Sequence, residues 1–243
     1  MRRALSAAAL TLLVFGCERD APTPAPRAED DAVDHAEGDV PRPARGGGAR
    51  DCADGSDDPE QIALYMESAE GGNLAGAIAG LEALAGAHPG SATARVRLGE
   101  LLLRDRAPAR ARPFFARALA LHDEGCTLAP RDEWAAAEGV ALTEMMTGDY
   151  ADAVPRLRAS LARWPGATPT RYNLACALCQ TGDLDGCERE LRTVLRPEAA
   201  LPAFLVDQRR PADHYQRMLA SDPDLAPLRA DEARLARVLA APQ

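Results

Sequence analysis

Two Gly-Asp pairs, Gly148-Asp149 and Gly182-Asp183, lie 34 residues apart, and each separates two amphipathic stretches. In these stretches apolar residues recur at the three- and four-residue spacing of a helix that buries one face. The sequence therefore predicts pairs of helices that repeat at a fixed interval. Such an interval is typical of a solenoid, in which each pair buries its apolar face against its neighbours.

The repeat extends over four units, and the same positions in each unit hold residues of the same size. The predicted units are 58–91, 92–125, 134–167 and 168–201, with 126–133 as an insertion that we expect to form a surface loop. The seventh residues are Leu64, Leu98, Val140 and Leu174, and the eighth are Tyr65, Gly99, Ala141 and Ala175. The twentieth are Ala77, Ala111, Ala153 and Cys187, and the twenty-fourth are Leu81, Phe115, Leu157 and Leu191. Small residues where two helices cross, with large ones beside them, predict helix hairpins packed along their length.

This pattern resembles the tetratricopeptide repeat in spacing and in residue class over residues 58–201, with Pro89 and Pro165 near the ends of their units. The resemblance implies an all-α fold, a right-handed αα superhelix of about four repeats. Residues 202–243 predict two further helical segments around Ser221-Asp222-Pro223, with Ser221 or Asp222 as N-cap and Pro223 in the first turn. We interpret them as a capping pair whose polar outer face ends the stack.

The N-terminus has the composition of an export signal. Residues 1–16 combine two arginines with an apolar run too short to span a bilayer, which predicts a signal peptide. The sequence Val14-Phe15-Gly16-Cys17 resembles the lipobox of bacterial lipoproteins, which implies that Cys17 carries the lipid. An ordinary signal peptide that ends at a chance cysteine is the alternative. Glu18 follows Cys17, and by resemblance to sorting signals this favours an outer-membrane lipoprotein that faces the periplasm.

Residues 17–57 are rich in Pro, Gly and charged residues and poor in large apolar ones. Such a segment buries too little surface to offset its loss of conformational entropy, so we expect a disordered tether. The tether would either let the solenoid move near its membrane or serve only as a spacer.

Composition and motifs argue against two function classes. The chain has 28 arginines, no lysine and 37 acidic residues, for a net charge of −9, which disfavours nucleic acid as a partner. The lack of lysine excludes a phosphate-loop lysine and Schiff-base chemistry. There is no Gly-x-Ser-x-Gly or His-Glu-x-x-His motif, and the four histidines are scattered. We therefore expect neither an enzyme nor a cofactor.

Five cysteines remain beyond Cys17. Cys176 and Cys179 share a helix face at a spacing of three, and with Met145 and Met146 they would suit a soft metal such as Cu(I) or Zn. We expect Cys187 to be a buried packing thiol, and Cys52 with Cys126 is a possible disulfide. Ordinary packing is the alternative for all of these cysteines.

In tetratricopeptide solenoids the first helices of successive units line the concave face, so the resemblance implies a binding groove. Its predicted lining is Ile62, Met66, Val96, Glu100, Leu103, Arg104, Leu142, Met145, Met146, Tyr172, Cys176 and Gln180. This surface is mostly apolar and suits a peptide with apolar anchors. The predicted function is a lipid-anchored envelope scaffold for a protein partner. The alternatives are a groove filled by the tether or the cap, and a periplasmic protein that handles thiols or soft metals.

Overall fold

The structure, a computed structural model, describes residues 59–195, 201–208, 210 and 212–240. Its helices are α2 (Pro59–Glu70), α3 (Leu74–Ala87), α4 (Ala92–Arg104), α5 (Pro108–Asp123), α6 (Pro130–Thr147), α7 (Tyr150–Arg163), α8 (Thr168–Gln180), α9 (Leu184–Val194), η1 (Ala203–Gln208), α10 (Ala212–Ser221), η2 (Pro223–Leu225), α11 (Ala226–Arg229) and α12 (Glu232–Leu239). These residues contain no strand. None of these helices is both long and apolar enough to cross a membrane.

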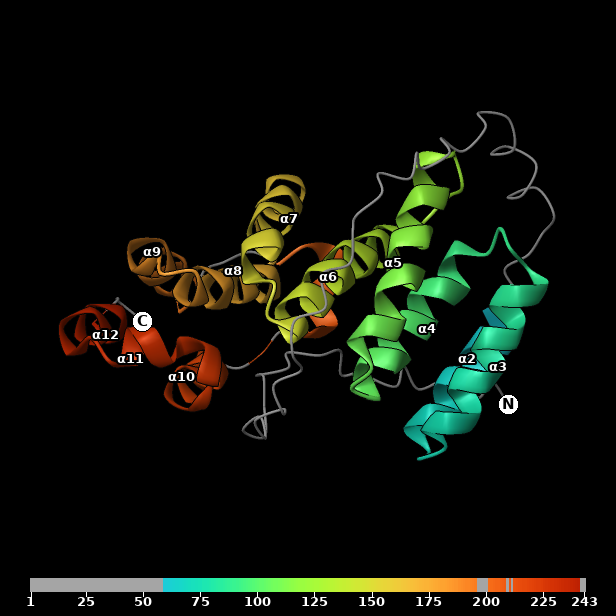
Figure 1. Cartoon of the computed structure of the whole chain (residues 1–243), viewed down its shortest axis with the longest axis horizontal. Helices are drawn as coiled ribbons and strands as arrows, with labels where there is room; N and C mark the ends of the chain where they lie inside the picture. The colour runs from blue at the N-terminus through green and yellow to red at the C-terminus, as the bar shows by residue number, and fades with distance from the viewer. Residues whose placement is uncertain (1–58, 196–200, 209, 211, 241–243) are drawn as a thin grey trace, which may run out of the picture.

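The helices form four successive hairpins, α2/α3, α4/α5, α6/α7 and α8/α9, and each hairpin packs on the next (Figure 1). The C-terminal helices follow at the end of the array, where η2 packs on α8 and α12 packs on α9. The predicted all-α solenoid is therefore confirmed.

The predicted Gly-Asp turns close the third and fourth hairpins. Gly148 and Gly182 have φ values of +94° and +86°, a left-handed conformation that glycine adopts without strain. Asp183 then caps α9, because its Oδ1 accepts a hydrogen bond from the amide of Gly186 at 2.8 Å. The turn residues thus end one helix and begin the next.

The ring of Phe115 lies against glycines of two different hairpins. A Cβ atom on Gly99 of α4 would be 2.7 Å from the ring, and one on Gly139 of α6 would be 2.5 Å from it. Phe115 itself is buried, so it cannot move into solvent to make room. The small and large residues identified in the sequence therefore set how closely α4, α5 and α6 approach.

The first unit departs from the prediction at its seventh residue. Leu98, Val140 and Leu174 are buried, whereas 64% of Leu64 is exposed. The expectation for Leu64 is wrong because α2 is the first described helix, and no described hairpin precedes it to cover this side. The close crossing of α2 and α3 is retained because the large residue lies on α2 and the small one on α3. The Tyr65 ring occupies the space that a Cβ atom on Gly80 would need.

The predicted insertion is not a surface loop throughout. Pro130 begins α6, so residues 130–133 form an extra helical turn, and Cys126 and Leu128 in the remaining loop are buried. Proline fits the first turn of a helix, where its missing N–H is not needed. At the cap, Asp222 and not Ser221 is the N-cap residue, because α10 extends to Ser221.

The Phe115 contact predicts opposite effects for one substitution at two glycines. Gly139→Ala should lower the free energy of unfolding by about 1–3 kcal/mol, because the new methyl group has no space beside the ring. Gly86→Ala in α3 meets no atom within 4 Å and should raise that free energy by up to about 1 kcal/mol. Urea denaturation of both variants measures the difference, and equal changes at the two positions would contradict the packing described.

Candidate binding groove

Helix α6 is buried on all sides, because it packs against α4, α5, α7 and α8. Nearly every residue from Asp132 to Met145 is buried. A helix in this position has little solvent-facing surface on which charges can lie. Its four acidic residues must therefore find partners within the protein.

Three of these four acids have arginine partners. Arginines on the helices that pack around α6 place a guanidinium beside each of these three carboxylates. The pairs are Asp132 with Arg97, Glu133 with Arg163 at 2.6 Å, and Glu144 with Arg112 at 3.0 Å and Arg156 at 2.8 Å. The fourth acid, Glu138, is different.

Glu138 is held by neutral hydrogen-bond donors. Its Oε1 accepts from Asn173 Nδ2 at 2.7 Å, and its Oε2 accepts from the Thr170 hydroxyl at 2.8 Å. That hydroxyl in turn accepts from Trp134 Nε1 at 2.9 Å. Burial raises the pKa of Glu138 to about 7, although both hydrogen bonds act to lower it. The carboxyl therefore changes its charge near neutral pH.

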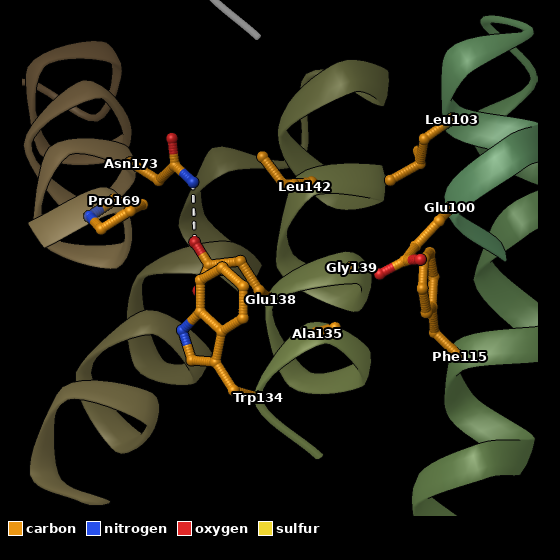
Figure 2. Close-up of a pocket in the computed structure, with 10 residues that line it drawn as sticks. All are labelled: Glu100, Leu103, Phe115, Trp134, Ala135, Glu138, Gly139, Leu142, Pro169 and Asn173. Atoms are coloured by element: carbon orange, nitrogen blue, oxygen red, sulfur yellow. Dashed lines mark hydrogen bonds between the residues drawn. The ribbon is translucent and has the colours of Figure 1, made fainter. Parts of the chain in front are cut away.

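Glu138 lies in a pocket between α4, α6 and α8 (Figure 2). The residues that line it are Glu100, Leu103, Phe115, Trp134, Ala135, Glu138, Gly139, Leu142, Pro169 and Asn173. The cavity volume is about 20 Å³, enough for about one water molecule. The pocket is thus narrow and mostly apolar, with carboxylates from α4 and α6.

The predicted groove residues are divided between this pocket, the core and the cap. Glu100, Leu103 and Leu142 line the pocket. Nine of the twelve are buried, and the partly or fully exposed ones are Arg104, Met146 and Gln180. The buried hydrophobic core includes Ile62, Met66, Val96 and Met145.

The C-terminal cap covers the groove at the fourth unit. The Tyr172 hydroxyl donates to Asp222 Oδ2 at 2.8 Å, and the Tyr150 hydroxyl donates to Asp224 Oδ1 at 2.6 Å. Gln180 Nε2 donates to the backbone oxygen of Asp224 at 2.8 Å. One alternative from the sequence, a groove filled by the cap, therefore applies to the fourth unit and leaves the pocket beside α4 and α6 open.

A disulfide joins Cys179 and Cys187 across the α8/α9 hairpin. The expectation that Cys187 is a packing thiol is wrong, because Cα atoms 5.3 Å apart bring the two sulfurs within bonding distance. The proposed Cys176–Cys179 metal pair loses one sulfur to this bond, and the described residues hold no group of three or more His, Cys, Asp or Glu side chains that could bind a metal ion. Cys126 is buried and disulfide-bonded, while Cys17 and Cys52 lie outside the described residues.

Sequence reasoning missed Glu138 although its position signalled it. Glu138 is the fifth residue of the third unit, the place that Ile62, Val96 and Tyr172 hold in the others. The repeat alone was sufficient to place it on the concave side. Its hydrogen-bond donors come from α8, more than 30 residues along the chain, and periodicity does not reveal them.

Glu138 predicts a pH-dependent stability. Below its ordinary pKa of 4.5 the carboxyl is protonated in both states. Between 4.5 and about 7 the unfolded state ionises first, so the native state loses stability as pH rises. Glu138→Gln removes this loss and should be more stable than the parent by up to about 3 kcal/mol at about pH 8.

The two chains should be nearly equal in stability at about pH 4. Urea denaturation across this range measures the difference between them, which cancels the titration of every other group. A difference that is constant with pH would show that Glu138 titrates normally.

Comparisons with known proteins agree with the fold. Two family models described as tetratricopeptide repeat match residues 69–125 and 144–204. No curated protein matches the chain. The solved structures of similar fold include the MamA RS-1 ArsTM double mutant, at 15% identity over 77% of this chain and 94% of that one, with a TM-score of 0.52.

Two others are YrrB, described as a TPR protein with an unusual peptide-binding site, and a putative kinesin light chain of Podosopora anserina with nearly identical TPR-like repeats. YrrB has 14% identity over 77% of this chain and 87% of that one, with a TM-score of 0.51. The kinesin light chain has 18% identity over 76% of this chain and 95% of that one, with a TM-score of 0.54. The family matches and the αα solenoid together show that this chain contains tetratricopeptide repeats, in residues 69–125 and 144–204.

Proposed function

We propose that this protein is a lipid-anchored scaffold of the bacterial envelope that binds a protein partner through the open part of its concave groove. The observation that carries the proposal is the pocket between α4, α6 and α8, which the cap leaves open while it covers the fourth unit. Repeats of this kind support a protein-interaction role in general. YrrB, one protein of similar fold, is described as having a peptide-binding site, which supports the proposal by analogy of fold.

The pocket marks a mostly apolar part of the concave face. Leu103, Leu142 and Phe115 provide apolar walls, and a few polar groups lie among them. Binding sites in proteins combine apolar surface with a small number of fixed polar groups, and a few anchors supply most of the binding energy. A peptide segment laid along the first helices would pass over this mostly apolar surface.

Two features support export and anchoring. The Cys179–Cys187 disulfide fits an oxidising compartment such as the periplasm. The signal-like residues 1–16, Cys17 and the tether 17–57 lie outside the described residues, so the lipid anchor rests on their sequence alone. Acyl chains on Cys17 would each add about 0.8 kcal/mol of membrane affinity per buried CH₂ group.

Photo-crosslinking in intact cells tests the groove. Met146 is partly exposed and lies one helical turn beyond Leu142 of the pocket. A photo-reactive residue at Met146 should give a discrete adduct with one partner at native expression. The same residue at the exposed Arg158 on α7 is the matched control. Equal adducts from both positions, or none from Met146, would contradict the proposal.

Cell fractionation tests the anchor. The parent protein should sediment with membranes and be released by detergent, because acylated cysteines insert into the bilayer. Cys17→Ser should appear in the soluble envelope fraction instead. Retention of the Cys17→Ser variant in the membrane fraction would count against the lipid anchor.

A further inference from the structure

The C-terminal end of the array carries an open polar cavity, separate from the groove that the first helices line. Residues of α9 and α12 form it, where these two helices pack on each other (Figure 1). Its volume is about 620 Å³, and ligand sites in proteins span roughly 300–1,000 Å³. The cavity is therefore large enough for a small organic ligand. Its lining residues are Asp185, Glu188, Arg189, Arg192, Thr193 and Arg237.

Both carboxylates of this cavity already have arginine partners from α12. Arg237 donates to Glu188 from Nε at 2.8 Å and from Nη2 at 2.7 Å, and Arg234 pairs with Asp185. Hydrogen bonds from these two arginines lower the pKa values of both carboxyl groups. The carboxylates are therefore ionised near neutral pH, and the two arginines of α12 balance their charges.

The two arginines of α9 keep their donors for a ligand. Arg192 Nη1 lies 3.8 Å from Glu188 Oε1, which is too far for a hydrogen bond, and 41% of the Arg192 side chain is exposed. Arg189 is exposed, and no carboxylate among the described residues forms an ion pair with it. Because residues three apart share a helix face, these two positive charges lie together at the cavity.

A dianion matches these two charges. A phosphate monoester carries a charge of about −1.5 to −2 near neutral pH and has three strong acceptor oxygens. Arginine binds such oxygens through paired, parallel hydrogen bonds. A carboxylate has a single charge and two oxygens, so it would leave one guanidinium without a partner. The preference is local, since the chain as a whole has a net charge of −9 and repels anions.

We infer that this cavity binds a phosphate monoester, held by the guanidinium groups of Arg189 and Arg192. The polar remainder of the cavity has room for the organic part of the ester. The same phosphate group occurs in small soluble esters and in the headgroup of phosphatidate lipids. The site lies on other helices than the proposed partner-binding groove, so it does not depend on that function.

Two small phosphates that differ in charge provide the first test. Isothermal titration calorimetry uses the full Cys17→Ser chain in low salt at about pH 8, where a monoester is a dianion. Glycerol 3-phosphate should bind about tenfold or more tightly than dimethyl phosphate, which has one charge and two free oxygens. Equal affinities for the two compounds would overturn the inference.

Substitutions on α9 locate the site. Arg189→Gln and Arg192→Gln should each lower the affinity for glycerol 3-phosphate by about tenfold or more, because each removes a charge-assisted contact. Arg158→Gln removes the same charge from an exposed site on α7 and should leave the affinity unchanged. Circular dichroism checks that all three variants fold. Equal effects of the three substitutions would contradict a site on α9.

Vesicles distinguish the two sources of the phosphate group. The Cys17→Ser chain is sedimented with vesicles of phosphatidylcholine, with and without phosphatidate. Binding that requires phosphatidate and is lost in both α9 variants supports the inference with a lipid headgroup as ligand. Binding of glycerol 3-phosphate alone, lost in the same variants, supports it with a soluble ester as ligand. Binding of neither glycerol 3-phosphate nor phosphatidate vesicles would overturn it.

Discussion

The packing of one aromatic ring against two glycines determines how the central hairpins fit together. Phe115 of α5 lies against Gly99 of α4 and Gly139 of α6, where any larger residue would collide with it. The close approach places α6 among four other helices. A helix enclosed in this way has little surface left for solvent, and this constraint determines which acidic residues of α6 need partners within the protein.

The distribution of charged partners around α6 determines the chemistry of the pocket. Acids on α6 that face α4, α5 and α7 meet arginines from those helices, such as Arg97 and Arg156. Glu138 meets Thr170 and Asn173 of α8, which donate hydrogen bonds but carry no charge. Burial raises the pKa of Glu138 to about 7. Within the described part of the chain, the same helix thus holds structural ion pairs and one acid in a pocket with no cation beside it.

The fold could be predicted from the sequence because its information is local and periodic. Small and large residues recur at fixed positions in each unit, and glycine marks the turns at Gly148 and Gly182. The exposure of Leu64 could not be predicted in this way. It depends on the position of α2 as the first helix of the described array, and the leucine itself does not reveal that position. The extra turn before Trp134 begins at Pro130. Proline is common both in the first turn of a helix and in loops, so the sequence does not fix where α6 begins.

The candidate site was predicted less completely, because its contacts join residues far apart in the chain. The cap is fixed by Tyr150 and Tyr172, whose hydroxyls bind Asp222 and Asp224 more than 40 residues later. The repeat numbering would have placed Glu138 on the concave side, but only the fold shows that no arginine among the described residues pairs with it. The Cys179–Cys187 disulfide likewise depends on how α8 and α9 face each other.

The pKa of Glu138, measured by carbon-13 NMR of its side-chain carboxyl, tests the account most directly. A buried carboxylate that accepts hydrogen bonds from neutral donors should titrate at about 7, because burial disfavours its charged form. A midpoint near the ordinary value of 4.5 would contradict the account. It would show that Glu138 is solvated or already paired with a cation.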